Sequence, residues 1–374
     1  MVQLLTDKVT SSLLGFGLVK DKRRKDFLCS YLISLALSRS VQFHKAAEHL
    51  NSAAKVSSNT TRIQDFYREV EIDYHALACL LYTLLPKNGK FRVTIDRTEW
   101  DFGKTQVNIL MVLVGVGDFQ IPLYWELLDN NSGCSSFQNR IDLLELLLQV
   151  IPVHRIGIVL ADREFIGLRW LSYLKQKGIG FCVRVPKNHH IERADGSIWT
   201  AEGILEAYPS GVQWENCRVD GIWGNVEIRP IVGIDGILFV FGTIKVALLA
   251  KLYRKRWGIE ACFQQLKTRG FNLEDSHMYH LDRLKKLVGM IALSYGLCLS
   301  IGVYRHHKQK PISKKNHGYK SNSFFRHGLN YLTNLFSQRK PGFEQELREM
   351  VLKAAIFIQE EYEVLMTVQT VKLE

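Results

Sequence analysis

Two acidic residues stand where an α/β protein could use them for chemistry. Asp96 ends the predicted strand in "FRVTID", and Asp162 ends the predicted strand in "RIGIVLAD". Acids at strand ends are commonly only helix caps or turn formers. Open α/β sheets, however, build their sites just outside the carboxyl ends of strands. We therefore treat both residues as candidate catalytic carboxylates.

Glu260 is a lone acid in a strongly basic predicted helix. From Lys251 to Arg269 there are six Lys or Arg residues against this one carboxylate. At 100° per residue, a helix places four residues within about 60° of arc, and these are Tyr253, Arg256, Glu260 and Lys267. A stripe of one tyrosine, two cations and one acid is not a core stripe. It indicates a helix that meets a metal ion and a phosphodiester together.

The chemistry that this set of residues allows is phosphoryl transfer. Three carboxylates with oxygen-only ligation can hold two Mg²⁺ ions about 3.5 to 4 Å apart. Such ions activate an attacking water or hydroxyl group and stabilise the leaving oxygen of an in-line displacement. The flanking Arg and Lys side chains then neutralise the charge of the phosphate. We expect Asp96, Asp162 and Glu260 to be the metal ligands.

The charge of the chain favours a polyanionic partner. The 374 residues carry a net charge of +12, and from Arg283 to Phe343 there are twelve Lys or Arg residues and no acid. A solvated face normally mixes both signs, so this run is typical of a surface that contacts phosphates. A plain basic surface is the alternative, because charge alone carries no sequence information.

The first part of the chain, residues 26–85, is predicted to be helical without strands. Apolar residues recur at three- and four-residue spacing, with Ser and Asn at the expected cap positions. Short helices with tight turns are compatible with a helix-turn-helix DNA reader that exposes Arg62, Gln64 and Arg68. A plain helical bundle is equally compatible with the pattern.

The middle of the chain predicts an α/β unit with an insertion. Three strands joined by hairpins, ending with "FQIPLYWELLD", precede alternating helices and strands, which describes a mixed sheet with helices on both faces. Residues 186–244 change to short β-rich runs bounded by Gly, Asp and Asn. This stretch is predicted to be an insertion, because a long helix from about Lys245 to Thr268 would complete the preceding unit.

Three segments resemble the catalytic motifs of bacterial insertion-sequence transposases of the DDE type: "TIDRTEW", "LADREF" and "YRKRWGIEACFQQLKTRGFNLED". One subgroup of that family has a Tyr-Arg-Glu-Lys signature, with two, three and six residues between its members. Tyr253, Arg256, Glu260 and Lys267 meet this spacing in full. The resemblance runs from about Phe91 to Asp275.

The resemblance implies a ribonuclease-H-like fold with a mixed five-stranded sheet, in which Asp96, Asp162 and Glu260 form the catalytic triad. It implies that Tyr253, Arg256 and Lys267 contact the terminal phosphates of the transposon end. Two Mg²⁺ ions are expected, with Mn²⁺ as a substitute. Members of the family stack a flipped-out base on an aromatic residue of the insertion, for which Trp199, Trp214 and Trp223 are candidates. Packing in the core of the insertion is the alternative for each tryptophan.

The partners implied by the resemblance are double-stranded DNA, as terminal inverted repeats and as target, and a second copy of the chain in a synaptic complex. The reaction would be cut-and-paste transposition through a 3′ nick, a hairpin intermediate and strand transfer. The expected organisation comprises five parts. They are a helical DNA-binding domain (1–88), the first part of the catalytic core (89–185), the insertion (186–244), the second part of the core (245–304) and a basic helical C-terminal region (305–374).

Other features bear on location and on metals. The seven cysteines form no C-x-x-C pair and suit a reducing compartment, and we expect a cytoplasmic, nucleoid-associated bacterial protein without a signal peptide. Residues 287–304 are uncharged over 18 residues, the lower limit for a membrane span, but a buried core helix is the preferred interpretation. His277 and His280 lack further zinc-ligand spacing, so we interpret them as surface histidines near DNA.

Two rival functions fit part of the pattern. A different two-metal nuclease on the same fold would need the three acids but not the stripe of Tyr253, Arg256 and Lys267. A non-catalytic relative that only binds DNA would be expected to lack at least one of the acids, and all three are present.

Overall fold

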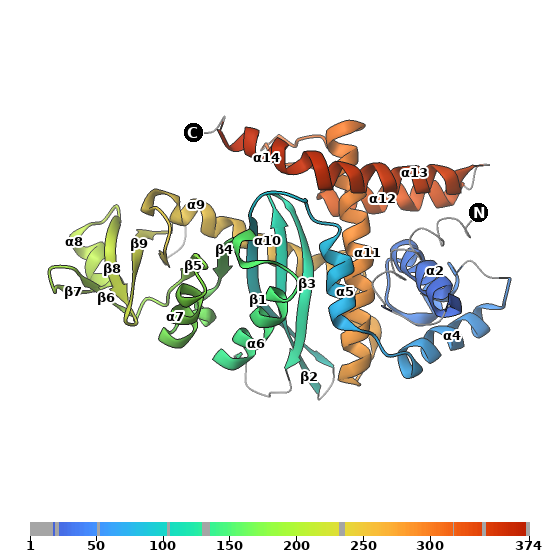
Figure 1. The fold of residues 1–374 in the computed structure, drawn as a ribbon, viewed down its shortest axis with the longest axis horizontal. Coiled ribbons are helices and arrows are strands. Elements are labelled where there is room, and N and C mark those ends of the chain that lie inside the picture. The colour runs from blue at the N-terminus through green and yellow to red at the C-terminus, as the bar shows by residue number, and fades with distance from the viewer. Residues whose placement is uncertain are drawn as a thin grey trace.

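The structure is a computed structural model, and it combines one large mixed sheet with helices at both ends of the chain (Figure 1). A long helix, α11 (Leu281–Lys308), stands beside the sheet, between the sheet and the helices α2 (Lys22–Ser38) and α4 (Val56–Glu69). The structure describes residue 18 and residues 22–50, 53–102, 105–128, 135–231, 236–316, 318–338 and 342–371.

The sheet contains ten strands in the order β3-β2-β1-β4-β5-β10-β9-β8-β6-β7. The strands are β1 (Phe91–Phe102), β2 (Thr105–Val116), β3 (Phe119–Leu128), β4 (Ile156–Ala161), β5 (Phe181–Arg184), β6 (His190–Arg193), β7 (Ile198–Thr200), β8 (Val212–Val219), β9 (Ile222–Pro230) and β10 (Ile237–Gly242). β1, β2 and β3 form antiparallel hairpins, whereas β4 and β5 run parallel to β1.

The sheet therefore has more strands than the five that were expected. The first five strands in the order are the predicted ones, but β10 pairs antiparallel with β5, with Phe241 opposite Val183. The β-rich insertion thus extends the edge of the same sheet and forms no separate layer. An edge strand leaves unpaired backbone groups, and β10 satisfies those of β5.

Short helices connect or cover the strands. They are α6 (Phe137–Leu148), α7 (Leu168–Gln176), α8 (Ala201–Ala207), α9 (Leu249–Tyr253) and α10 (Trp257–Leu266), with 3₁₀ turns at Val153–Arg155, Arg163–Phe165, Val246–Leu248, Arg254–Arg256 and Leu273–Ser276. The predicted continuous helix from Lys245 to Thr268 is wrong, because the 3₁₀ turn Arg254–Arg256 separates α9 from α10.

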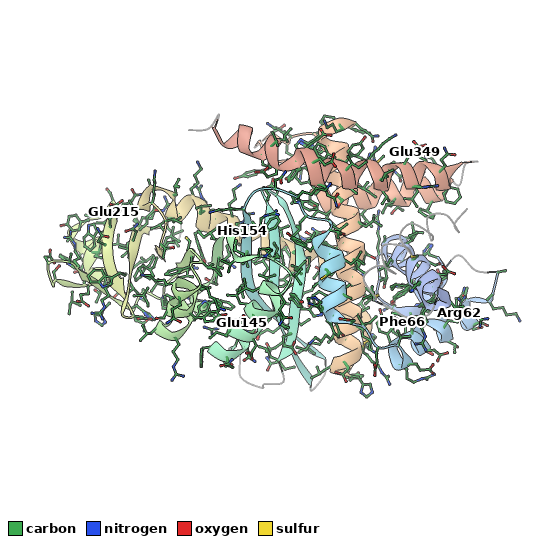
Figure 2. All side chains as sticks on the ribbon, viewed as in Figure 1. Arg62, Phe66, Glu145, His154, Glu215 and Glu349 are labelled. Atoms are coloured by element: carbon green, nitrogen blue, oxygen red, sulfur yellow. The ribbon has the colours of Figure 1, made fainter. Side chains whose placement is uncertain are left out.

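The N-terminal helices pack against α11. They are α2 (Lys22–Ser38), α3 (Phe43–Ala47), α4 (Val56–Glu69) and α5 (Tyr74–Tyr82). Phe66 is buried while Arg62 lies on the exposed side of α4 (Figure 2). The Ser294 hydroxyl on α11 donates a hydrogen bond to the Leu32 carbonyl at 2.8 Å, which ties this layer to the centre of the molecule.

Helix α11 is the central core helix. By length and composition it could cross a membrane, but 89% of its most apolar window is buried inside the protein, as expected for a core helix. Its contact with α12 (Phe324–Gln338) is very close, because a Cβ at Gly302 would lie 1.8 Å from the Phe324 carbonyl oxygen. Only glycine allows the two backbones to approach to this distance.

The basic C-terminal region is helical and partly neutralised. It contains α12, α13 (Phe343–Ile356), a π-helical turn (Phe357–Glu361) and α14 (Tyr362–Val371). Three cations of the acid-free run pair with acids from other segments: Lys285 with Glu126, Lys308 with Glu361 and Lys320 with Asp118. The run is therefore partly a structural surface, and Arg339 and Lys340 lie outside the described residues.

His307 gives this region a pH-dependent stability. Its ring lies among the rings of Phe324, Phe357 and Tyr362, at centroid distances of 6.0, 5.9 and 5.9 Å. Burial lowers the pKa of His307 to about 4, and the nearby cations His306, Lys320 and Lys308 act in the same direction while Asp118 opposes them. The folded protein therefore holds a neutral imidazole at pH values where the unfolded chain is protonated.

We expect the free energy of unfolding to fall by on the order of 2 kcal/mol as the pH decreases from 6.5 to 4. The reason is that His307 binds a proton in the unfolded state but stays neutral in the folded state. The His307→Gln variant should lose this part of the pH dependence. Urea unfolding at pH 7 and pH 4.5 measures both. Equal pH slopes for the two proteins would contradict this role of His307.

Candidate active site

The first two acids meet at the end of a parallel strand pair. The pairing of β1 with β4 ends with Ile95 opposite Ala161, so Asp96 and Asp162 are the next residues on adjacent strands. The expectation that Asp96 ends its strand is wrong, because β1 continues to Phe102 in its hairpin with β2. The position that matters is the end of the parallel pairing, where side chains are free to face a site.

The third acid, Glu260, is brought to this place by α10. The 3₁₀ turn before α10 repeats every three residues, so Tyr253 and Arg256 lie on one side. Arg256 Nη1 donates a hydrogen bond to Asp96 Oδ2 at 2.6 Å, and Nη2 donates to Glu260 Oε1. One guanidinium therefore bridges two of the three predicted acids.

Tyr253 completes the network. Its hydroxyl donates a hydrogen bond to Asp162 Oδ1 at 2.9 Å and accepts one from Arg256 Nε at 3.2 Å. The structure thus joins Asp96, Asp162 and Glu260 through two residues of the predicted stripe. We call these five residues the acid network.

The acid network is largely shielded from water. The side chain of Arg256 is 9% exposed, that of Asp96 16% and that of Glu260 30%. Burial raises the pKa of Asp96 to about 6, although Arg256 and the Arg97 N–H lower it, and the charges of Asp162 and Glu260 raise it further. Burial also raises the pKa of Tyr253, which keeps its hydroxyl protonated as a donor.

Arg256 compensates the clustered negative charge. Burial lowers the pKa of its guanidinium, but Tyr253, Asp96 and Asp162 outweigh burial and the pKa is raised. Bidentate guanidinium groups are suited to bridging carboxylates. In this structure the guanidinium supplies the positive charge that buried carboxylates need.

The three acids are chemically suited to bind a divalent cation, but their present arrangement does not suit one. Oxygen-only carboxylate sets are the ligands that Mg²⁺ prefers. In the described ranges, however, no three Asp, Glu, His or Cys side chains are grouped closely enough to hold a metal ion. Arg256 lies between Asp96 and Glu260, so a metal ion held by both would require the guanidinium to withdraw.

Lys267 lies apart from the acid network, contrary to the helical stripe. It is the C-cap of α10, where the backbone leaves helical geometry. Its ammonium group donates a hydrogen bond to the Glu99 carbonyl at 2.8 Å and pairs with Glu274 at 3.3 Å. The stripe fails here because α10 ends at Leu266.

A supporting ion-pair network lies beside the acids and was not predicted. Arg97 pairs with Glu164 at 3.2 Å, and Glu164 accepts hydrogen bonds from the Ser135 N–H and hydroxyl. The Arg97 N–H also donates to Asp96 Oδ1 at 2.8 Å. Arg97 follows Asp96 by one residue, and Glu164 follows Asp162 by two. This spacing is the sequence signal that could have revealed both residues.

The aromatic candidates in the insertion differ in exposure. Trp199 and Trp214 pack edge to face at a centroid distance of 5.8 Å, and both also contact Tyr208. Trp223 is 45% exposed. Beside the acid network, Trp257 follows Arg256 directly and is 61% exposed, which sequence reasoning missed.

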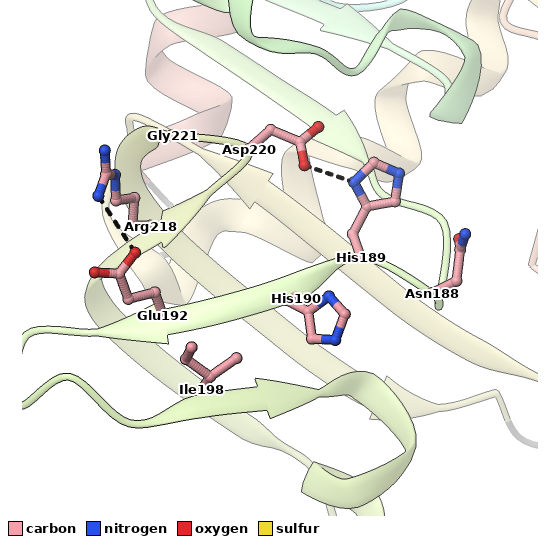
Figure 3. Close-up of a pocket in the computed structure, with 8 residues that line it drawn as sticks. All are labelled: Asn188, His189, His190, Glu192, Ile198, Arg218, Asp220 and Gly221. Carbon is pink, nitrogen blue, oxygen red and sulfur yellow. Dashed lines mark hydrogen bonds and ion pairs between the residues drawn. The ribbon is translucent and has the colours of Figure 1, made fainter.

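The insertion also carries a polar surface pocket, distinct from the acid network (Figure 3). His189 and Asp220 form a hydrogen-bonded pair at 2.8 Å, and Arg218 pairs with Glu192 at 3.4 Å. Arg218 and Glu192 thus neutralise each other, and Asp220 has the His189 ring as its hydrogen-bond partner.

The sequence of residues 138–297 matches the family model described as the transposase DDE domain. The matched segment includes Asp162, Tyr253, Arg256 and Glu260, while Asp96 lies outside it. This match supports a DDE-type transposase, an enzyme of DNA transposition.

No curated protein matches the chain in sequence. Among solved structures, the chain is similar to one described as the cryo-EM structure of the piggyBac transposase synaptic complex with hairpin DNA. The identity is 11%, the coverage is 88% of this chain and 76% of that chain, and the TM-score is 0.41. This TM-score is too low to define a shared fold, and the assignment rests on the sequence match.

Substitution of Arg256 should show how much its positive charge stabilises the folded protein. We expect Arg256→Gln to lower the free energy of unfolding in metal-free buffer by about 3 kcal/mol, because Asp96 and Glu260 lose their shared cation. Added Mg²⁺ or Mn²⁺ should restore part of this loss by supplying positive charge. Urea unfolding with and without metal tests both expectations. The exposed neighbour Arg254 provides the control, since Arg254→Gln should change little.

Proposed function

We propose that this transposase cleaves double-stranded DNA at the ends of an insertion sequence and joins those ends to target DNA. The observation that carries the proposal is the acid network. Three acids from β1, the end of β4 and α10 converge with an arginine and a tyrosine from the segment that precedes Glu260.

The fold supports a ribonuclease-H-like core. The order β3-β2-β1-β4-β5, with three antiparallel strands followed by two strands parallel to β1, is the arrangement proposed for it. The core would comprise residues 89–185 and 245–304, interrupted by the insertion at 186–244. Residues 1–88 would form a DNA-binding region, and residues 305–374 a basic helical one.

Asp96, Asp162 and Glu260 would hold two divalent ions, for which we propose Mg²⁺. When bound, the ions supply an activated nucleophile and stabilise the charge of the leaving oxygen. The carboxylates contribute by fixing the ions at the end of the parallel strands. The burial that raises the pKa of Asp96 also excludes water, which strengthens every electrostatic interaction in the site.

Arg256 and Tyr253 would exchange partners when DNA and metal bind. With Asp96 and Glu260 holding a divalent ion, the Arg256 guanidinium would be released from them and would bind the scissile or terminal phosphate. The Tyr253 hydroxyl, released from Asp162, can likewise donate to a phosphate oxygen. Lys267 would contact a phosphate further along the strand.

The partners that we propose are the terminal inverted repeats, the target DNA and a second copy of the chain in a synaptic complex. The net charge of +12 supports a DNA partner. A two-ended reaction needs two active sites, which a homodimer would provide.

The Glu260→Gln variant tests this function. We expect Mg²⁺-dependent cleavage of a labelled duplex carrying the element's own terminal repeat to fall at least about a hundredfold, or roughly 2.7 kcal/mol in barrier. Binding of the same duplex at fixed low salt should be retained. Both are measured by gel electrophoresis with the same protein preparation.

The exposed acid Glu215 on the insertion provides a matched control, and Glu215→Gln should cleave at the rate of the wild type. Unchanged cleavage in Glu260→Gln would remove Glu260 from the metal site. Cleavage without any divalent ion in the wild type would contradict the proposed chemistry.

A further inference from the structure

A basic site lies away from the acid network, where the N-terminal helices meet the start of α11. It is a cavity of about 340 Å³ between α4 and the segment that leads into α11. The residues that concern us are Gln64 and Arg68 from α4, His277, Tyr279 and His280 from the connecting segment, and Arg283 from α11. No carboxylate is present among the described residues that line this cavity.

The connecting segment is shaped by two unusual backbone conformations. Asn272 and His277 have φ values of 52° and 51°, in the left-handed region that non-glycine residues rarely adopt. They stand on either side of the 3₁₀ turn Leu273–Ser276 and direct the following residues toward α4. Strained conformations of this kind persist where the surrounding structure holds them, and they cluster at functional sites.

Hydrogen bonds hold the two walls of the cavity together. The Lys286 ammonium group donates to the Tyr67 carbonyl at 3.0 Å, which joins α11 to α4. The Val41 N–H donates to the Phe271 carbonyl at 2.9 Å, which joins the N-terminal region to the connecting segment. The cavity is therefore preformed by tertiary contacts and does not depend on one flexible loop.

The carboxylates that pair with Arg68 would compete only weakly with a bound phosphate. Arg68 pairs with Asp65 and Glu69, and all three side chains are substantially exposed. Exposed ion pairs contribute about 0 to 1 kcal/mol, so a phosphate with two or three acceptor oxygens can displace them. Arg68 and Arg283 face this cavity from different helices, as required to hold one anionic strand between them.

The cavity lies toward the same end of the sheet as Lys267, for which we propose a phosphate contact. Glu99, whose carbonyl accepts the hydrogen bond from Lys267, is in register with Asn108 on β2, and Asn108 is in register with Leu128 on β3. Near this end of β3, the Trp125 indole donates to the Lys285 carbonyl at 3.0 Å. Three adjacent strands span about 10 Å, so α11 begins within a short stretch of duplex from Lys267.

We propose that this cavity binds the phosphodiester backbone of double-stranded DNA, as a second contact beyond the cleaved end. Arg68 and Arg283 bind phosphate oxygens, and His277 and His280 flank the same strand. Gln64 and Tyr279 supply a hydrogen-bonding group and an aromatic ring at its rim. The site rests on the proposed function, because the duplex is the one that the acid network cleaves.

The test compares two duplexes. The shorter one covers only the cleaved end, and the longer one continues through the terminal repeat. In the double variant Arg68→Gln, Arg283→Gln, the Kd for the longer duplex should rise at least about tenfold, while the Kd for the shorter duplex stays within about twofold. Two lost phosphate contacts should reduce the slope of log K against log salt by about 1.8.

Two further variants make the result specific. The double variant Arg68→Lys, Arg283→Lys keeps the charge and should keep most of the salt slope and the affinity. The double variant Lys187→Gln, Lys353→Gln removes two exposed charges elsewhere and should bind both duplexes as the wild type does. Circular dichroism tests whether each variant is folded.

The outcomes separate this site from the proposed function. Unchanged binding of the longer duplex in the Arg68, Arg283 double variant would overturn the site, and so would an equal loss for both duplexes. Retained cleavage of the shorter duplex by that variant supports a contact separate from the chemistry. Failure of the wild type to cleave either duplex with Mg²⁺ would refute the proposed function instead.

Discussion

The site depends on one constraint: acidic side chains that are grouped and shielded from water need a cation among them. Arg256 meets this need by holding Asp96 and Glu260 on one guanidinium. The compensation is incomplete, since burial still raises the pKa of Asp96 to about 6. A charge balance of this kind keeps the acids assembled without a metal ion, and in the proposed mechanism Arg256 moves away from them when metal ions bind.

The rest of the fold serves to bring the members of this balance together. The parallel pair β1–β4 places two acids side by side, and the 3₁₀ turn before α10 directs Tyr253 and Arg256 toward them. Helix α11 then joins the catalytic sheet to the N-terminal helices through one continuous core. The DNA-binding surfaces that we propose on α4 and beside the acid network are thereby held at a fixed distance, which suits a long rigid duplex.

The convergence of the three acids could be predicted from the sequence because their signals are local. An Asp that directly follows a run of apolar strand residues, and one carboxylate in a basic helix, can be recognised without tertiary information. Three features could not be recognised in this way. The inward direction of Arg256 depends on the acids of other segments, and the end of α10 at Leu266 places Lys267 outside the stripe. The pairing of β10 with β5, which doubles the sheet, is a long-range contact.

The ten-stranded sheet also bears on how two copies of the chain can associate. On the side of the insertion it ends with β7, which has only three residues (Ile198–Thr200). A very short edge strand offers few unpaired backbone groups to another chain, a common protection against edge-to-edge aggregation. Joining of two molecules by sheet extension at this end is thus disfavoured. A pair of copies that act on two DNA ends would therefore meet through surfaces other than β7, such as helices, loops or the DNA itself.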